Sequence, residues 1–299
     1  MKYLITGSSG FIGSRLYDFL EKEGHIVIGV SKNKKKNPHR DIICDLEIDS
    51  LKKKDLYGVT TVFHLAGLAH DLSNPKALKN KFISLNVEAT KKLAQLAADS
   101  GVKNFIFVSS VKAEIEDTDH KNSNEETDGI YGKTKRSAEL EILEFSSKID
   151  MRVFIVRPAL VYGTEIKGNL LLMKNAIKNG WFPPLPKIYN NRSMIHVDDL
   201  VRAIVLVEKE GKNREIYNVT DGEDYSTTRI YEAMHEMLGK APPKIRVPLF
   251  LVKLMRYIPG NIGYKITKLL DDENYCSSKI VSLGFRAKLK FENLNETLF

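Results

Sequence analysis

Residues 2–13 read Lys-Tyr-Leu-Ile-Thr-Gly-Ser-Ser-Gly-Phe-Ile-Gly, a pattern that is typical of one class of fold. The apolar run before the glycines predicts a β-strand, and the apolar residues at helical spacing after them predict a helix. Gly7 allows a tight turn, Gly10 lets a pyrophosphate approach the backbone, and Gly13 lets the helix pack close to the strand. The helix N-terminus then offers free amides to the phosphates. The pattern predicts a dinucleotide site rather than a purely structural turn, lined by Gly7, Gly10, Phe11, Ile12 and Gly13.

The alternation of strands and helices continues along the first half of the chain. Strand-like apolar runs occupy 26–30, 42–44, 59–65, 105–109 and 153–156, and helical patterns occupy 11–22, 77–100 and 131–147. Strands that are separated by helices indicate βαβ units and a mostly parallel sheet. We therefore predict an α/β fold with a Rossmann-type, doubly wound parallel sheet.

The pattern changes after residue 157. Glycines and the proline-rich run 183–186 indicate loops, whereas a helix from about Asp198 and a strand over 216–219 suit the sheet again. We expect two interleaved domains. Residues 1–157 plus 194–220 would form the dinucleotide-binding Rossmann domain, and residues 158–193 plus 221–299 a smaller α/β domain that binds the substrate.

The composition is that of an ordinary globular protein. The 299 residues are 42% hydrophobic and 28% charged, which excludes general disorder. Two cysteines argue against a disulfide framework and suit a reducing, cytoplasmic location, and we expect no metal site. No run of about 18 apolar residues is present, so we expect no membrane span. The net charge of +8 suits an anionic partner, but 46 basic residues are spread among 38 acidic ones, which disfavours nucleic acid.

The apolar helix predicted over 249–257 has two interpretations. It could lie on a membrane surface, or it could pack in the core. Lys253 and Arg256 are too few for a basic anchoring face, so the helix is assigned to the core.

The end of the second strand indicates which dinucleotide is bound. Proteins that bind NAD place an acidic residue there, whose carboxylate accepts a hydrogen bond from the adenosine ribose. Here that position holds Ser31, followed by Lys32 and the lysine run 34–36. A hydroxyl followed by cations suits the 2′-phosphate of NADP, so NADP(H) is favoured. NAD(H) is the alternative if the lysines merely line the surface.

Three residues predict proton-transfer chemistry. Tyr131 and Lys135 are four residues apart, hence on one face of a predicted helix whose expected N-cap is Asp128. An ammonium beside a phenol favours the phenolate, which suits proton transfer to and from a sugar or alcohol oxygen. Ser110 follows the strand 105–109, where its hydroxyl can hydrogen-bond the same oxygen. The alternative is that a Tyr-x-x-x-Lys pair only decorates a helix surface.

In this order the motifs resemble those of the extended short-chain dehydrogenase/reductases, in the nucleotide-sugar epimerase/dehydratase family. The matching stretches are Thr-Gly-x-x-Gly-Phe-Ile-Gly at 6–13, His-Leu-Ala-Gly at 64–67, Ser-Ser at 109–110, Tyr131 to Lys135, and Arg-Pro at 157–158 through Val-Tyr-Gly at 161–163. The resemblance covers nearly the whole chain. It is specific for the family, but not for the substrate.

The resemblance implies the roles of further residues. Catalysis falls to Ser110, Tyr131 and Lys135, of which Lys135 also holds the nicotinamide ribose. The cofactor contacts are Asp45 and Leu46 at the adenine, and Leu65, Ala66 and Gly67 at the phosphates and the nicotinamide ribose. The substrate contacts are Asn169 and Leu170 after Lys167, Arg192 at a phosphate, and Lys268 as a further phosphate partner. Asn86 packs beside the active site, unless it is a helix surface residue, and His196 is structural.

The resemblance also implies the reaction, which is hydride transfer at C4 of a UDP-linked hexose or hexosamine. Ser31 and the lysines favour a reductase of a UDP-4-keto-6-deoxy-hexosamine. The alternative is a UDP-hexose or UDP-HexNAc 4-epimerase with tightly bound NAD, and the alternative from another class is a non-catalytic NADP(H)-binding regulatory protein. A dehydratase is disfavoured, because Val111 and Lys112 stand where its acid/base pair is needed.

Two further expectations concern the assembly and one loop. By resemblance the helices predicted over 77–100 and 131–147 pair with a second copy to form a homodimer. The stretch 114–128 contains seven acidic residues and departs from the family pattern. It either caps the sugar pocket or is a solvated loop.

Overall fold

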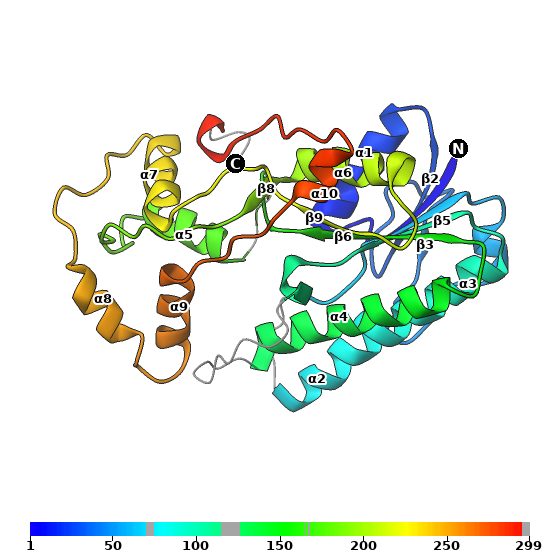
Figure 1. Ribbon diagram of the computed structural model, residues 1–299, viewed down its shortest axis with the longest axis horizontal. Coiled ribbons are helices and arrows are strands. Elements are labelled where there is room, and N and C mark those ends of the chain that lie inside the picture. The colour runs from blue at the N-terminus through cyan, green and yellow to red at the C-terminus, as the bar shows by residue number, and fades with distance from the viewer. Residues whose placement is uncertain (70–74, 115–125, 165, 167, 295–299) are drawn as a thin grey trace.

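The computed structural model describes residues 1–69, 75–114, 126–164, 166 and 168–294, and its centre is a single parallel sheet (Figure 1). The strands pair in the order β3-β2-β1-β4-β5-β6-β9, each parallel to its neighbours. Their bounds are β1 (Lys2–Thr6), β2 (Ile26–Ser31), β3 (Ile42–Ile43), β4 (Thr61–His64), β5 (Asn104–Val108), β6 (Arg152–Pro158) and β9 (Ile216–Val219). The order reverses between β1 and β4, where such sheets bind ligands at their carboxyl ends. The predicted Rossmann-type fold is confirmed.

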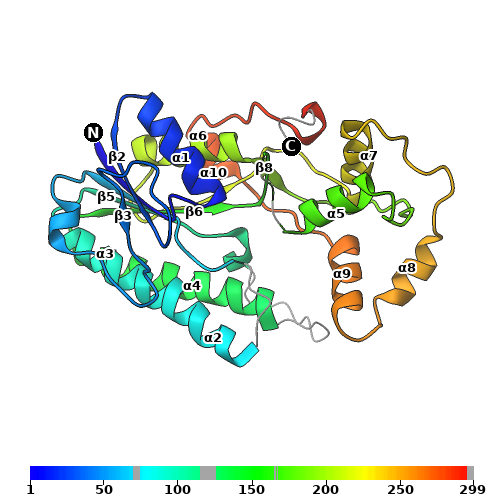
Figure 2. The same cartoon turned by 180° about the vertical axis from the view of Figure 1, so that it is seen from behind.

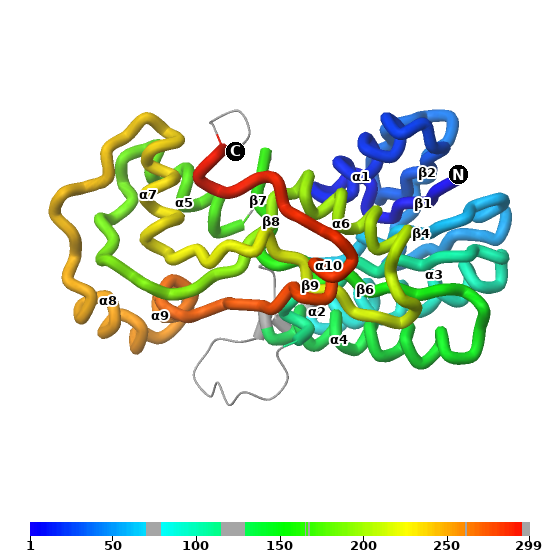
Figure 3. Tube along the Cα trace, turned by 45° about the horizontal axis from the view of Figure 1, so that its top comes forward, coloured from blue at the N-terminus to red at the C-terminus, as the bar shows by residue number. Residues whose placement is uncertain are grey.

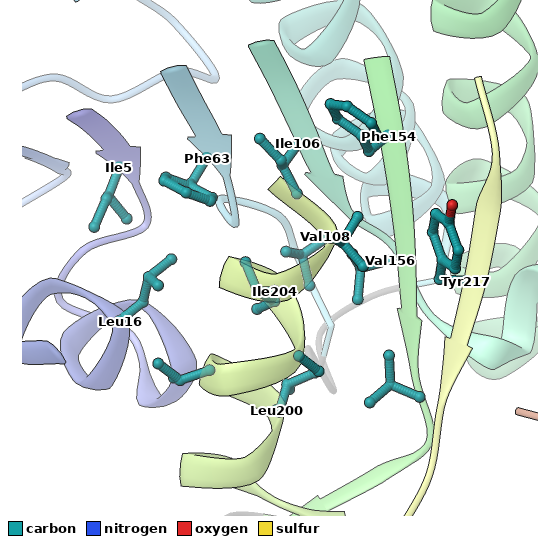
Figure 4. Close-up of a cluster of buried hydrophobic side chains, with 14 of the residues drawn as sticks. Ile5, Leu16, Phe63, Ile106, Val108, Phe154, Val156, Leu200, Ile204 and Tyr217 are labelled. Carbon is teal, nitrogen blue, oxygen red and sulfur yellow. The ribbon is translucent and has the colours of Figure 1, made fainter. Parts of the chain in front are cut away.

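Helices cover both faces of this sheet (Figures 1 and 2). One face carries α1 (Phe11–Lys22) and α6 (Val197–Glu210), and the other carries α3 (Ala89–Asp99) and α4 (Glu126–Ser146). Figure 4 shows the core on the first face, in which Leu16 and Leu200 pack against strand residues such as Ile5 and Val156. All five residues of β5 are buried, as expected for a strand covered on both sides.

The helix predicted over 77–100 is not continuous. It consists of α2 (Pro75–Ile83), a π-helical turn η2 (Ser84–Glu88) and α3. Single π-helical turns are rare and frequently mark functional sites. The buried Asn86 lies in this one.

The helix that carries Tyr131 begins earlier than predicted. α4 starts at Glu126, so Asp128 lies within the helix, and its assignment as the N-cap was wrong. Residues 126–130 lack the apolar periodicity from which a helix is read, so this turn gave no signal. Gly132 fits closely against the short helix η3 (Val111–Glu114), because a Cβ on it would stand 2.5 Å from the Lys112 carbonyl oxygen.

The chain after residue 158 builds a further cluster beside the sheet. β7 (Leu160–Tyr162) and β8 (Met194–His196) form a two-stranded parallel sheet. The helices nearby are α5 (Gly168–Lys178), α7 (Thr227–Met237) and α9 (Asn261–Leu270). Figure 3 shows them at the end of the molecule remote from the N-terminus, from which the chain returns through α10 (Ser278–Ser282) beside β9.

The assignment of the helix over 249–257 to the core was wrong. α8 (Leu249–Met255) buries Val252, whereas Phe250 and Leu254 expose 63% and 62% of their surface. The helix lies at the outer edge of the molecule, where no further layer covers it among the described residues (Figure 1).

Candidate active site

The glycine turn lies at the carboxyl end of β1 and leads into α1. Gly7 has a φ of +71°, and a Cβ on it would stand 2.8 Å from the Ala66 backbone nitrogen. A Cβ on Gly13 would stand 2.2 Å from the Gly7 carbonyl oxygen, so only glycine allows the helix to approach the turn this closely. Gly10 is the N-cap of α1, and within the described chain no side chain caps that end of the helix. Phe11 and Ile12 form its first turn, whose free amides fit a pyrophosphate.

The residues predicted at the adenosine end engage one another. The Ser31 hydroxyl, at the end of β2, donates to the Lys34 carbonyl oxygen and accepts from the Lys34 amide at 3.1 Å. The Lys32 ammonium lies 2.6 Å from the Asp45 carboxylate, and this hydrogen-bonded pair raises the pKa of Lys32 and lowers that of Asp45. Lys36 pairs with the Asp18 carboxylate at 2.7 Å. Carboxylates of the chain itself thus pair with Lys32 and Lys36, two of the cations that were expected to bind a 2′-phosphate. The structure therefore gives the NADP(H) preference no support.

A buried carboxylate that sequence reasoning missed holds this loop in place. Asp41 is 4% exposed and accepts hydrogen bonds from the Gly29 amide on β2 and from the Lys36 and Asn37 amides, each at 2.8 Å. Tyr17 of α1 donates a further bond to it at 3.1 Å. Asp41 follows a stretch rich in lysine and asparagine, where no periodic signal marks a buried acid. Leu46 packs beyond the loop, against the core beneath the sheet.

The end of β4 approaches the glycine turn. The Leu65 amide donates to the Thr6 carbonyl oxygen, and the Ala66 amide donates to the Thr6 hydroxyl, both at 3.2 Å. A Cβ on Gly67 would stand 3.2 Å from the Lys135 ammonium nitrogen, so this backbone lies directly against the predicted catalytic lysine. The structure thus brings the predicted phosphate and ribose contacts together at the carboxyl edge of the sheet.

Asn86 connects this backbone to α4. Its side-chain oxygen accepts from the Leu68 amide at 2.8 Å, and its side-chain nitrogen donates to the Leu68 carbonyl at 3.1 Å and to the Thr134 hydroxyl at 3.2 Å. Thr134 in turn donates to the Tyr131 carbonyl oxygen at 3.0 Å. Asn86 is fully buried, so its interpretation as a helix surface residue was wrong.

Lys135 is buried at the centre of the site, with 4% of its surface exposed. Its ammonium donates a 3.0 Å hydrogen bond to the Val108 carbonyl oxygen and lies 4.5 Å from the centre of the Phe107 ring. Burial lowers the pKa of Lys135 to about 8, against an opposing effect of the Glu139 carboxylate. The Lys135 ammonium therefore loses its proton at a lower pH than an exposed lysine does.

Ser110 and Tyr131 lie on the two sides of the contact between η3 and α4. The Ser110 hydroxyl is buried after β5 and accepts from the Lys112 amide at 3.2 Å. Tyr131 is partly buried, with its ring centre 6.3 Å from that of Phe82. The close fit of Gly132 on η3 sets the turn that carries Tyr131 against the segment that follows Ser110. All three predicted catalytic residues thus lie at one edge of the sheet.

His64 lies beneath this edge and is structural. Its two ring nitrogens lie 2.6 Å from the Thr6 hydroxyl and 2.8 Å from the Thr90 hydroxyl. Complete burial and the Lys135 ammonium lower the pKa of His64 to about 3, so the ring is neutral. His196 accepts a bond from the Asp198 amide at 3.2 Å as the N-cap of α6, a role that agrees with its predicted structural place.

The two predicted phosphate-binding cations lie together. The Arg192 guanidinium donates to the Lys268 carbonyl oxygen, and its side chain lies 3.9 Å from the Glu273 carboxylate. The Lys268 ammonium lies 3.3 Å from the same carboxylate, and Lys112 pairs with it as well. Burial acts to raise the pKa of Glu273, but the three cations hold it below its ordinary value. The Arg192 Nε is buried and has no hydrogen-bond partner among the described residues, so the cluster retains a donor for an anion.

Sequence reasoning missed Lys112 and Glu273. Lys112 is two residues from Ser110 in the chain, and this proximity is the one signal that could have pointed to it. Glu273 lies 161 residues from Lys112 and carries no motif, so only the tertiary structure reveals the pair.

The remaining predicted substrate contacts lie in the first turn of α5. Asn169 is exposed, whereas Leu170 is buried in the core that includes Tyr162 and Met194. Lys167 and residues 115–125, which hold most of the acidic loop expected to cap the pocket, lie outside the described residues.

In the ranges that the structure covers, no cluster of three or more His, Cys, Asp or Glu side chains is arranged to hold a metal ion. Nor does any helix in those ranges combine the length and apolarity needed to traverse a bilayer.

Known proteins resemble this chain along most of its length. The UDP-glucose 4-epimerase of Vibrio cholerae is 29% identical over 268 residues, which cover 86% of this chain and 82% of the relative. The N-acetyl-α-D-glucosaminyl-diphospho-ditrans,octacis-undecaprenol 4-epimerase of Escherichia coli O157:H7 is 26% identical over 294 residues, which cover 97% and 86%.

A solved structure shares the fold. The UDP-glucuronic acid 4-epimerase of Bacillus cereus, in complex with NAD, superposes with a TM-score of 0.76 at 19% identity, and the match covers 99% of this chain and 97% of that one. Residues 3–220 match the NAD dependent epimerase/dehydratase family as a whole. With the glycine turn and the Ser110, Tyr131 and Lys135 edge already described, the chain belongs to the NAD dependent epimerase/dehydratase family.

Proposed function

We propose that the protein is an NAD-dependent 4-epimerase that inverts C4 of a UDP-linked hexose or hexosamine. The observation that carries the proposal is the buried Lys135, one helical turn from Tyr131 and directly against Gly67, beside a glycine cradle that fits a pyrophosphate. The relatives from Vibrio cholerae and Escherichia coli support the choice of reaction, because both are named as 4-epimerases.

The residues of the site divide the work at the sugar O4. Tyr131 takes the O4 proton as C4 is oxidised and returns it as C4 is reduced, while the Ser110 hydroxyl hydrogen-bonds O4. The nicotinamide, when bound, supplies the reversible two-electron oxidation of C4. The Lys135 ammonium stabilises the phenolate and, from its position against Gly67, holds the ribose of the cofactor.

Inversion also requires that each face of the 4-keto sugar can be turned toward the nicotinamide, which returns the hydride to C4. The sugar must therefore turn while the rest of the substrate stays bound. Arg192, Lys268 and Lys112 are suited to hold the diphosphate during this turn, because their cations outnumber the single carboxylate of Glu273. We further propose that Asn169 reaches the nucleotide from α5, and that the predicted division into a dinucleotide domain and a substrate domain applies.

The cofactor in this proposal is NAD rather than NADP. Its support is the pairing of Lys32 with Asp45 and of Ser31 with Lys34, which occupies the groups that would meet a 2′-phosphate. The experiment is mass spectrometry of the dinucleotide that the purified protein releases on denaturation. NAD at about one per chain is expected from an enzyme that recycles its cofactor. An empty protein that binds NADPH more tightly than NADH would support the 4-keto-reductase instead.

The proposed homodimer would use the face of α2 and α4. Ile83 and Leu140 on these helices expose 38% and 49% of their surface. Light scattering of the wild type and of Leu140→Glu tests this. A dimer that the variant dissociates supports the interface, and a monomeric wild type contradicts it.

A further inference from the structure

The helices α8 and α9 and their flanking loops present an unusual surface, here called the α8–α9 surface and formed by residues 245–265. Within this stretch eight large apolar side chains are exposed. They are Ile245 (85%), Phe250 (63%), Leu251 (43%), Leu254 (62%), Met255 (39%), Tyr257 (79%), Ile258 (41%) and Ile262 (52%). Single exposed apolar residues are ordinary, but a group of this kind on two helices that contact each other is typical of an interaction site.

The chain around this surface is basic. Residues 237–270 contain seven lysines and arginines and no aspartate or glutamate, whereas the whole chain has a net charge of +8. Arg246 and Arg256 are paired, with Glu232 at 2.5 Å and Asp271 at 2.8 Å, from neighbouring elements. Lys244, Lys253 and Lys265 are exposed to solvent. Exposed ammonium groups therefore border the apolar side chains.

The apolar residues of α8 share one side of the helix. Phe250 and Leu254 are four residues apart, as are Leu251 and Met255, so the pairs stand one above the other, while Val252 faces the protein. Lys253 is exposed beside Leu254. An apolar side with adjacent lysines is the arrangement by which amphipathic segments bind in the headgroup region of a bilayer.

A groove lies beside this surface. It has a volume of about 700 Å³ and runs between α8 and the segment 187–190, with Phe250, Leu254 and Tyr257 on one wall. It is also lined by residues 270–272, at the end of α9, the helix on which Lys268 stands. The groove therefore lies next to the helix that carries Lys268, one of the proposed diphosphate-binding cations.

A second copy of this chain fits the surface poorly. A symmetric dimer would place the same patch against itself and would enclose two sets of exposed lysines, Lys244, Lys253 and Lys265, in one interface. An anionic bilayer complements both features, because headgroups attract the ammonium groups and the acyl boundary receives the apolar residues.

We propose that the α8–α9 surface docks the protein on an anionic membrane. Phe250, Leu254 and Tyr257 enter the headgroup region, and Lys253 and Lys265 contact the anionic lipids. If the proposed 4-epimerase function holds, docking also places the diphosphate cluster within reach of a sugar diphosphate whose second phosphate carries a lipid.

The experiment is flotation of the full-length protein with lipid vesicles, a readout that needs no enzymatic turnover, so its failure is distinguishable from failure of the 4-epimerase proposal. Vesicles of phosphatidylethanolamine and phosphatidylglycerol are compared with vesicles of phosphatidylcholine alone. We expect binding to the anionic vesicles that falls with added salt. Phe250→Ser with Leu254→Ser should reduce the bound fraction about tenfold, and so should Lys253→Glu with Lys265→Glu.

Matched controls lie at the other end of the molecule. Ile48→Ser with Tyr57→Ser removes apolar side chains that are 84% and 82% exposed, and Lys53→Glu with Lys54→Glu reverses two exposed lysines of η1 (Lys53–Leu56). Both control variants should bind vesicles as the wild type does. The proposal is overturned if the wild type does not float with anionic vesicles, if both surface variants bind as well as it does, or if the controls lose binding equally. Should the apolar variant fail to fold, the lysine variant decides the matter alone.

Discussion

The ammonium of Lys135 donates a 3.0 Å hydrogen bond to the carbonyl oxygen of Val108, the last residue of β5. This bond joins the helix that carries Tyr131 to the strand end that precedes Ser110. It also holds the ammonium beside Gly67, where a Cβ would stand 3.2 Å from the Lys135 nitrogen. One buried cation thus connects the elements that carry Tyr131 and Ser110, the two residues that we propose act at the sugar O4.

Replacing Tyr131 by phenylalanine removes the proposed acid/base group and leaves the ring. We expect turnover to fall by about 10²–10⁴-fold, the range by which a positioned general acid/base contributes. Dinucleotide affinity, measured by fluorescence titration, should change little, because the glycine cradle is untouched. A Tyr131→Phe enzyme that keeps most of its turnover would exclude the assigned role.

The charge of Lys135 should make activity and stability respond oppositely to pH. Its pKa is lowered from 10.5 to about 8, so the ammonium is lost as pH rises through about 8, and turnover should decline there. Between about pH 8 and 10.5 the unfolded chain holds more protons than the folded one, so this group's contribution to stability rises with pH.

The comparison that isolates this effect is with Lys135→Met, by urea denaturation across the pH range. Between about pH 8 and 10.5, the free energy of unfolding of the wild type should rise by up to about 3 kcal/mol relative to that of the variant. The variant itself should have lost turnover at every pH. A stability difference that does not vary with pH would contradict a lowered pKa.

The close contact of Gly13 with Gly7 should make the first helix intolerant of a methyl group. A Cβ at Gly13 would stand 2.2 Å from the Gly7 carbonyl oxygen, so Gly13→Ala must displace α1 from the turn. We expect a loss of about 1–3 kcal/mol of stability and a clear loss of dinucleotide affinity. Gly239→Ala is the matched control, because it strains a backbone at φ +63° and should reduce stability without altering affinity. Equal affinities in the two variants would mean that the turn does not hold the cofactor.

Glu273 should compete with the substrate for the cations around it. Its carboxylate pairs with Lys112 and Lys268 and lies 3.9 Å from Arg192. Glu273→Gln should therefore strengthen UDP binding by about fivefold in calorimetry, while the free protein loses some stability because the cations repel one another. Weaker UDP binding in this variant would show that Glu273 orders the site rather than competing for it.

Much of the fold could be read from local patterns. The glycines at 7, 10 and 13 need close backbone approaches that few other folds require, and the βαβ rhythm follows from apolar runs. The carboxyl edge of the sheet could likewise be located, because Ser110 and Tyr131 each sit near the end or start of a recognisable element.

The features that could not be read depend on contacts between distant parts of the chain. In the sequence, the residues of the π-helical turn that buries Asn86 follow the same apolar pattern as an α-helix, so the pattern does not reveal the turn. The Lys32–Asp45 pair neutralises a cation that appeared available to a phosphate. The exposure of α8 depends on whether another layer covers it, and apolar periodicity alone does not show which surroundings a helix has.

Epimerisation at C4 without added cofactor tests the central claim most directly. The purified protein is incubated with UDP-glucose or UDP-N-acetylglucosamine in buffer that contains no dinucleotide, and the C4 epimers are followed by proton NMR. We expect conversion to an equilibrium mixture in the wild type and none in Tyr131→Phe. No conversion of either sugar by a wild-type protein loaded with NAD, together with NADPH-dependent reduction of a UDP-4-keto sugar, would contradict it.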